Sequence, residues 1–338
     1  MKKSLVVLMM LMVFLSFGWA EGQKDSGSDE TEIYTMKFGH SMPTETSRHQ
    51  SLLKFKDYVE AESEGRIVVE IYPSGQLGKE AEMLEALKLG SQEGYLGGVF
   101  DSITPKLNLY LMPFLFADQE ALMRFANSDL ADEINKDAEQ YGIKLLANGD
   151  AGSRNVTNNI RPVHTPADMV GLKMRTPPVE AIIKTMEALG ANPVSIPYVE
   201  VYMALKTGVA DGQENPYMNI ATMKFQEVQK YMTVMHYLFN PEPFCVALDW
   251  FNTLPADLQK VVDMGADVYT ESQNKMRADS SDEYLQIIKD AGVEVYTPTA
   301  VERKEFIDAC APVYEYYMGK GFFTQAELDK AISIASGK

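Results

Sequence analysis

The amino-acid sequence predicts an α/β fold built as two lobes with a cleft between them. Strand-like and helix-like segments alternate from residue 33 onward, an order that is typical of parallel sheets covered by helices. The alternation forms two successive series, one before and one after residue 150, and a mostly helical segment follows from Leu254. The chain has 338 residues, of which 46% are hydrophobic, so it is long enough to build two cores.

The first series spans residues 33–150. Its strands are marked by alternating or β-branched apolar residues, and its first helix carries Leu52, Phe55 and Val59 on one stripe. The elements expected here are strands at 34–40, 65–75 and 142–150, and helices near 47–63 and 79–90.

The second series spans residues 151–240, and the same signals recur in it. The elements expected here are strands at 171–175, 192–196 and 209–214, and helices at 179–189, at 199–207 and from Pro216. In the helical tail, residues 255–290 contain only weak helix breakers, which is compatible with one long helix, and 292–298 has the pattern of a further strand.

The N-terminal residues 1–20 have the features of a cleaved signal peptide. Two lysines precede the apolar run 5–15, and Gly18 and Ala20 supply small residues for cleavage. The alternative is a membrane anchor, but the apolar run is short for a spanning helix. Residues 21–32 are polar and read as a disordered leader. The mature protein is therefore expected to lie outside the cytoplasm, without stable insertion in a membrane.

The charge and the cysteines exclude several classes of partner. The formal net charge is −17, from 31 Lys and Arg against 48 Asp and Glu, which argues against binding nucleic acid or anionic lipid. Cys245 and Cys310 are too few for a structural metal site, and no metal or cofactor is expected. Export permits a disulfide between them, but the sequence does not show that they meet.

The catalytic motifs of common enzymes are missing from the sequence. The four histidines do not form H-E-x-x-H, and neither a G-x-S-x-G elbow nor a phosphate-binding glycine loop is present. The chain is therefore expected not to be an enzyme.

Polar side chains stand where two predicted strands run into helices. Arg175 ends the strand in "GLKMRTPP", where Thr176 and the proline after it suit a helix start. Asn215 in "DGQENP" occupies the same kind of junction. Ligands of open α/β sheets bind beyond the carboxyl ends of the strands. Arg175 also fits a surface arginine and Asn215 a plain helix cap, but two such junctions about forty residues apart favour a shared anion site.

The chain resembles the substrate-binding proteins of tripartite ATP-independent periplasmic (TRAP) transporters, of the type that binds dicarboxylates, sialate or sugar acids. The resemblance covers residues 33–330 and is carried by "GHSMP", "IYPSGQLGKEAEMLEAL", "GLKMRTPP", "VEVYMALKTGVADGQENPYMNI" and "FQEVQKYM". It implies a two-lobe solute-binding fold with crossing hinge strands and a long helix spanning both lobes. Lobe I would hold 33–150 with about 241–280, and lobe II 151–240 with about 281–338.

The resemblance implies roles for two arginines and an asparagine. Arg175 matches the arginine that pairs with the ligand carboxylate, and Asn215 matches an asparagine that hydrogen-bonds the same group. Arg154 in "AGSRNVTN" matches a second arginine at the lobe crossing. A guanidinium binds a carboxylate through two parallel hydrogen bonds, which lysine cannot reproduce. Because burying an unpaired arginine costs several kcal/mol, we expect Arg175 to stay in water until a ligand arrives.

Three more residues are expected at the cleft. Tyr198 in "SIPYVEVY" resembles the ring that packs against the ligand, and Glu80 and His40 lie in segments that match first-lobe loops facing the cleft. Residues 234–255 match the family only in outline, so contacts from that segment stay open.

The resemblance therefore predicts a protein that captures a small organic acid by lobe closure and delivers it to a TRAP membrane permease. The proposed contacts favour a sugar acid or hydroxy acid over a simple dicarboxylate. Two alternatives remain at this point. One is an extracytoplasmic enzyme acting on an acid, with Glu80 and His40 as an acid/base pair, and the other is a solute sensor that docks on a receptor.

Overall fold

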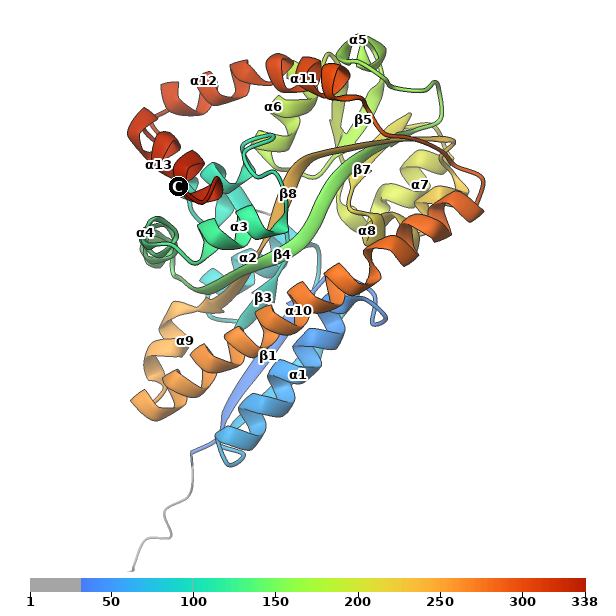
Figure 1. Cartoon of the computed structure of the whole chain (residues 1–338). Coiled ribbons are helices and arrows are strands. Elements are labelled where there is room, and N and C mark those ends of the chain that lie inside the picture. Colours follow the sequence, from blue (N-terminus) through green and yellow to red (C-terminus); the bar gives the residue numbers. More distant parts are fainter. Residues whose placement is uncertain (1–31, 99) are drawn as a thin grey trace, which may run out of the picture. The chain divides into compact units, whose positions relative to one another are not determined.

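Figure 1 shows the computed structural model, which describes residues 32–98 and 100–338. The predicted signal peptide and the predicted leader up to residue 31 lie outside the described residues. Residues Ile33–Lys338 form one compact unit, which carries the helices and strands described below.

The strands of this unit form one sheet. They are β1 (Tyr34–His40), β2 (Ile67–Tyr72), β3 (Gly94–Leu96), β4 (Ile143–Asn158), β5 (Lys173–Thr176), β6 (Asn192–Ser195), β7 (Gly212–Asn215), β8 (Tyr231–Ala247) and β9 (Glu294–Tyr296). The order across the sheet is β2-β1-β3-β8-β4-β7-β5-β6, with β9 paired to β8. β1 is parallel to β2 and β3, and β5 is parallel to β6 and β7. The parallel pairing predicted for each series is confirmed.

The α-helices predicted at 47–63, 79–90, 179–189, 199–207 and from Pro216 are present, and each begins within two residues of its predicted start. The α-helices of the unit are α1 (Ser47–Glu62), α2 (Glu80–Lys88), α3 (Gln119–Ala126), α4 (Asp129–Asp137), α5 (Pro166–Met169), α6 (Glu180–Ala188), α7 (Val201–Lys206), α8 (Tyr217–Thr222), α9 (Leu248–Thr253), α10 (Ala256–Asp290), α11 (Ala300–Ala309), α12 (Ala311–Gly319) and α13 (Gln325–Ala335). The single long helix is confirmed as α10, which has 35 residues.

Two long strands, β4 and β8, connect the parallel sets of the sheet. They are antiparallel to each other over most of their length, and Figure 1 shows them crossing the centre of the fold. β8 also pairs with β3 and β4 also pairs with β7, so each strand reaches both sets. The crossing strands implied by the family resemblance are confirmed. The predicted strand 142–150 is too short, because β4 continues to Asn158 through irregular register near Asp150 and Arg154.

Helix α10 contacts α1, β4 and α8, and thus elements of both series. Figure 1 shows it running beside α1 and on toward α8. The approach to α1 is close at Gly265, where an added Cβ would lie 2.7 Å from Val59 Cγ2 and 3.0 Å from the ring of Phe55. Glycine is needed here because both neighbours are fully buried and have little room to move.

We expect Gly265→Ala to lower the free energy of unfolding by about 1–2 kcal/mol, because overpacking outweighs the gain in helix propensity. Gly319→Ala at the end of α12 is the matched control, since nothing lies within 4 Å of its added Cβ. Urea unfolding of the two variants measures the difference. Equal stabilisation by both substitutions would contradict the close packing of α10 on α1.

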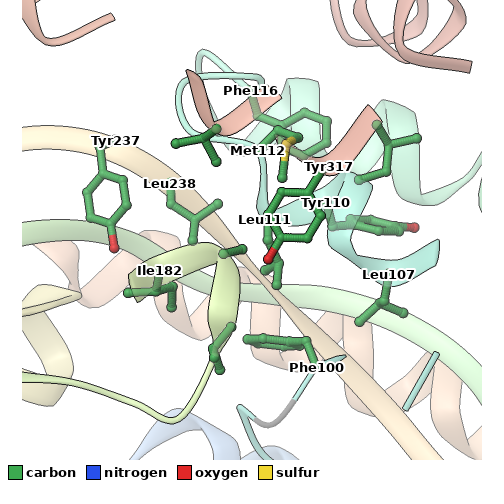
Figure 2. Packing of buried hydrophobic residues seen from close by; sticks show 14 of the residues in the cluster. Phe100, Leu107, Tyr110, Leu111, Met112, Phe116, Ile182, Tyr237, Leu238 and Tyr317 are labelled. Carbon is green, nitrogen blue, oxygen red and sulfur yellow. The ribbon is translucent and has the colours of Figure 1, made fainter. Parts of the chain in front are cut away.

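The largest buried cluster joins the segment after β3 to the second series and the C-terminal helices. Figure 2 shows Tyr110 and Phe116 of that segment in one packed group with Tyr317 of α12 and Ile182 of α6. A second cluster holds α1 and α10 on the sheet through the aromatic rings of Phe38, Phe55, Phe244 and Tyr269. Near these cores, Arg175 on β5 and Asn215 on β7 line the same pocket as Glu80 at the start of α2.

Candidate functional site

A pocket with an empty volume of about 460 Å³ lies where the ends of β5 and β7 meet the crossing strands. The structure brings five of the six predicted site residues to its walls: Glu80, Arg154, Arg175, Tyr198 and Asn215. It also adds residues that were not predicted, of which the most polar are Arg48, Asn219 and Asn240. The sixth predicted residue, His40, does not line this pocket.

Arg175 at the end of β5 is almost completely buried, with 1% of its surface exposed. Its Nε and Nη2 donate to the carbonyl oxygen of Ile196 at 2.9 and 2.7 Å. Within the described part of the chain it forms no ion pair. Burial lowers the pKa of Arg175 to about 10, against the opposing effect of Glu214. In this structure the surrounding segments cover Arg175, and the carbonyl of Ile196 takes part of its hydrogen bonds. That Arg175 stays in water until a ligand arrives remains a prediction.

Arg154 on β4 is also buried, but it has a carboxylate partner. Its Nε and Nη2 both donate to the side chain of Glu214 on β7, with an Nη2 to Oε1 distance of 2.7 Å. The hydroxyl of Tyr237 donates to the same carboxylate at 2.5 Å. Burial disfavours the charge of Arg154, but the attraction of Glu214 outweighs it and raises the pKa. Arg154 is thus electrically balanced before any ligand binds.

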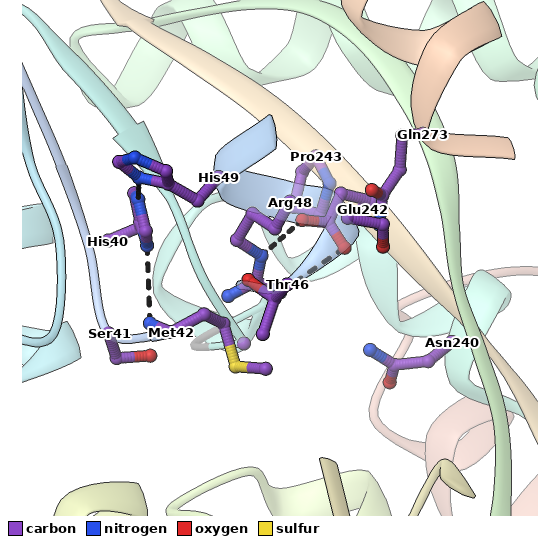
Figure 3. Close-up of polar contacts among 12 residues, drawn as sticks. His40, Ser41, Met42, Thr46, Arg48, His49, Asn240, Glu242, Pro243 and Gln273 are labelled. Carbon is purple, nitrogen blue, oxygen red and sulfur yellow. Dashed lines mark hydrogen bonds and ion pairs between the residues drawn. The ribbon is translucent and has the colours of Figure 1, made fainter. Parts of the chain in front are cut away.

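Arg48 in the first turn of α1 repeats this arrangement from another part of the chain. Its Nε and Nη2 donate to the carboxylate of Glu242 on β8, as Figure 3 shows, and the hydroxyl of Tyr269 donates to that carboxylate at 3.0 Å. Glu242 is 1% exposed. The site therefore contains two Arg–Glu–Tyr groups, and sequence reasoning found only Arg154 among their six members.

The amide side chains of the pocket are partly engaged with one another. Asn215 Nδ2 donates to Gln213 Oε1 at 2.5 Å, and Asn219 Nδ2 donates to Asn215 Oδ1 at 3.1 Å. In contrast, Oδ1 of Asn240 and the hydroxyl of Tyr198 are buried and have no hydrogen-bond partner within the described residues. Buried polar atoms are normally satisfied, so both atoms are available for hydrogen bonds with a molecule or water in the pocket. Asn240 comes from the segment whose contacts the sequence left open.

Glu80 at the start of α2 lines the pocket with its carboxylate held in place. Oε1 accepts a hydrogen bond from Ser41 Oγ at 2.5 Å, and Oε2 accepts one from the backbone N–H of Gly98 at 3.4 Å. The pocket thus presents an acceptor as well as arginines, a combination that suits a molecule carrying both a carboxylate and hydroxyl groups.

The side chain of His40 is fully buried. Figure 3 shows its ring next to that of His49 and above Met42. Its Nδ1 accepts from the backbone N–H of Met42 at 3.2 Å, and its Nε2 lies 3.1 Å from Nδ1 of His49. Burial lowers the pKa of His40 to about 3, and the charge of Arg48 acts in the same direction. His40 lines neither this pocket nor the pocket that adjoins it, and its ring nitrogens face His49 and Met42 and not Glu80.

The family follows from comparison with known proteins. Residues 38–320 match the family model DctP, described as bacterial extracellular solute-binding protein, family 7. The chain belongs to this family. It is 31% identical over 300 residues to the 2,3-diketo-L-gulonate-binding periplasmic protein YiaO of Escherichia coli K12, covering 88% of this chain and 91% of the relative. It is 33% identical over 289 residues to the C4-dicarboxylate-binding periplasmic protein DctP of Rhodobacter capsulatus, covering 84% and 86%.

Solved structures of the same family share the fold. A TRAP periplasmic solute-binding protein from Anaerococcus prevotii with bound D-glucuronate superposes with a TM-score of 0.86 at 26% sequence identity, covering 90% of this chain and 99% of that chain. The predicted two-lobe TRAP solute-binding fold is thereby confirmed. The relatives are solute-binding proteins, which supports the prediction that this family member is not an enzyme.

Three further features of this family 7 protein bear on the sequence predictions. Between residue 32 and the C-terminus, leaving out residue 99, no helix is both long and apolar enough to cross a bilayer. The same residues contain no cluster of three or more His, Cys, Asp or Glu side chains placed to hold a metal ion. Cys245 and Cys310 are both buried free thiols, so the structure does not join them.

Proposed function

We propose that this protein captures a small organic acid in the periplasm, with Arg175 as the anchor for the ligand carboxylate, and delivers the acid to a TRAP membrane permease. The observation that carries the proposal is that, in the part of the chain that the structure describes, only two of the three arginines lining the pocket are paired with a carboxylate of the protein. Arg48 and Arg154 each face a buried glutamate, whereas Arg175 has no carboxylate partner among the described residues. A buried arginine without a counter-charge is costly, and a ligand carboxylate supplies that charge.

The neighbouring groups favour a hydroxylated monocarboxylate over a dicarboxylate. Once the two Arg–Glu pairs are set aside, the pocket retains Arg175 and the carboxylate of Glu80. A second ligand carboxylate would meet Glu80 with unfavourable charge, whereas a ligand hydroxyl can donate to it. Asn215, Asn240 and Tyr198 offer further partners for hydroxyls. A sugar acid or hydroxy acid therefore fits the pocket better than succinate does.

The names of the relatives support this ligand class without deciding it. The Escherichia coli relative is named for a sugar acid, and the Anaerococcus prevotii structure holds D-glucuronate. The Rhodobacter capsulatus relative is named for C4-dicarboxylates. The members that resemble this chain thus include both classes, and Glu80 and the unpaired oxygens of Asn240 and Tyr198 are the local reasons for choosing the first.

Ligand-dependent thermal stability tests the proposal directly. We expect gluconate, glucuronate or a related hydroxylated monocarboxylate to raise the melting temperature, because a ligand at 100 times its Kd stabilises the folded state by about 2.7 kcal/mol. Succinate should stabilise less at the same concentration. Mass spectrometry of an acid extract from protein purified without unfolding would identify any ligand retained from the host. The absence of stabilisation across a broad panel of organic acids would contradict capture of an acid.

Delivery to a permease is tested in cells. Deletion of the gene is expected to abolish growth on the identified acid at low concentration and to stop uptake of the labelled acid. Normal uptake in the deletion strain, with a lost transcriptional response to the acid, would instead indicate a sensor.

A further inference from the structure

A second pocket adjoins the first at Glu80, Arg175 and Tyr198, which line both. Its empty volume is about 490 Å³. The rest of its wall comes from Ser41, from the residues around the start of α2, and from the segments that precede α6 and α7. Arg175 lies on the boundary, so an acid held there by its carboxylate has two directions in which to extend.

The two pockets differ in the chemistry of their walls. The first is lined by three arginines and three asparagines. The second shares Glu80, Arg175 and Tyr198 with the first and includes Ser41 and Lys79, but its other side chains are apolar: Ala81, Pro178, Pro197 and Val199. Proline contributes no N–H donor, and alanine and valine side chains have no polar atoms. A hydroxyl group placed against this wall would lose hydrogen bonds with water and find few replacements. An alkyl or aryl group would gain by leaving water.

Two charged groups of the second pocket, those of Lys79 and Glu80, already have partners, whereas Arg175 has no carboxylate partner among the described residues. Lys79 Nζ lies 2.8 Å from Oε1 of Glu200, and this hydrogen bond raises the pKa of Lys79. Glu80 is held by Ser41 and Gly98, as described above. Lys79 is turned toward Glu200, although both side chains are about half exposed and such pairs are weak. The apolar side chains are therefore the feature that distinguishes this pocket from the first.

We propose that the second pocket is an apolar subsite, and that the ligand is a hydroxylated monocarboxylate with a short alkyl or aryl substituent. The carboxylate and hydroxyl groups lie in the first pocket, and the substituent lies against Ala81, Pro197 and Val199. This inference rests on the proposed function, because it takes Arg175 as the carboxylate anchor. It narrows the ligand class to acids that have one polar and one apolar end.

Titration calorimetry with straight-chain 2-hydroxy acids, from glycolate to 2-hydroxyhexanoate, measures how affinity depends on the length of the alkyl chain and so tests the subsite. Affinity should rise by about two- to fourfold for each added methylene until the pocket is full. Affinity that stays flat or falls with chain length overturns the subsite, and so does binding of gluconate with no binding of the longer 2-hydroxy acids. The carboxylate anchor is judged separately, since unchanged affinity of these acids for Arg175→Lys would overturn the proposed function instead.

A substitution in the apolar wall gives a second, independent readout. Val199 is 45% exposed, so Val199→Asn should fold, and we expect it to reduce the gain in affinity per methylene. Val301→Asn is the matched control, because Val301 is 73% exposed on α11 and lines neither pocket. The control should show the same dependence on chain length as the unmodified protein. Equal dependence in both variants would contradict contact between the substituent and Val199.

Discussion

Replacing Arg175 with lysine is expected to weaken binding of a hydroxylated acid by about thirtyfold or more while the protein keeps its fold. Lysine retains a positive charge but lacks the planar guanidinium that gives a carboxylate two parallel hydrogen bonds. Arg175 already spends Nε and Nη2 on the carbonyl of Ile196, which holds the guanidinium in one orientation. A lysine ammonium has no comparable means of being oriented. Titration calorimetry with the acid identified by mass spectrometry measures the loss.

Arg161→Lys is the control for this experiment. Arg161 also donates to backbone carbonyls, with Nε 2.8 Å from the oxygen of Asp168 and Nη2 2.6 Å from that of Val170, but it does not line the pocket. We expect the affinity of Arg161→Lys to match that of the unmodified protein. If Arg175→Lys also binds the acid with unchanged affinity, then Arg175 is not the carboxylate anchor.

A helix or strand was predictable from the sequence where the spacing of its apolar residues shows which side is buried. Strand β1 and helix α1 follow this rule, because their apolar residues repeat with the period of the element. Helix α10 was indicated instead by the lack of strong helix breakers in residues 255–290 and by the family resemblance. The crossing strands did not follow this rule. β4 changes register near Asp150 and Arg154 and is buried on both sides for much of its length, so alternation of apolar and polar residues stops although the strand continues. The family resemblance implied that strands cross between the lobes, but it did not give the length of β4, which was predicted too short.

The site was predictable where a polar residue stands at a strand end. Arg175 and Asn215 stand at such ends, and the structure places both on the pocket wall. Arg48 shows why other residues were missed. It lies in an amphipathic helix, where an arginine usually faces water, and its burial depends on Glu242, which is 194 residues away in the sequence. His40 shows the opposite case. The family resemblance placed it at the cleft, but at the end of β1 its side chain is buried against Met42 and His49.

The two Arg–Glu–Tyr groups have a common physical consequence. In each, a buried glutamate accepts hydrogen bonds from an arginine and from a tyrosine hydroxyl, so the arginine is charged, oriented and balanced. The groups come from different elements, with Arg48 on α1 and Arg154 on β4. Each Arg–Glu pair at the pocket has no net charge. The charged side chains of the pocket that remain outside such a pair are Arg175 and Glu80. This division explains why three arginines can line a pocket that we propose binds one carboxylate.

Because Glu214 balances the buried charge of Arg154, we expect Glu214→Gln to lower the free energy of unfolding by about 3–5 kcal/mol. Glutamine keeps the size of the side chain and can still accept a hydrogen bond from Arg154 or Tyr237. It does not supply the negative charge, so Arg154 is left as a buried cation without compensation. Chemical denaturation in the absence of ligand measures the loss, which should exceed that of any exposed Glu→Gln substitution.

Glu187→Gln on α6 provides the comparison, because Glu187 pairs with Lys184 at 2.8 Å and its side chain is 46% exposed. Surface pairs of this kind contribute about 0–1 kcal/mol, so Glu187→Gln should change stability little. Adding Arg154→Met to Glu214→Gln should recover part of the loss, since the double variant no longer buries an unpaired charge. Similar small effects of Glu214→Gln and Glu187→Gln would mean that Glu214 does not balance Arg154, and the argument that Arg175 alone awaits a carboxylate would then fail.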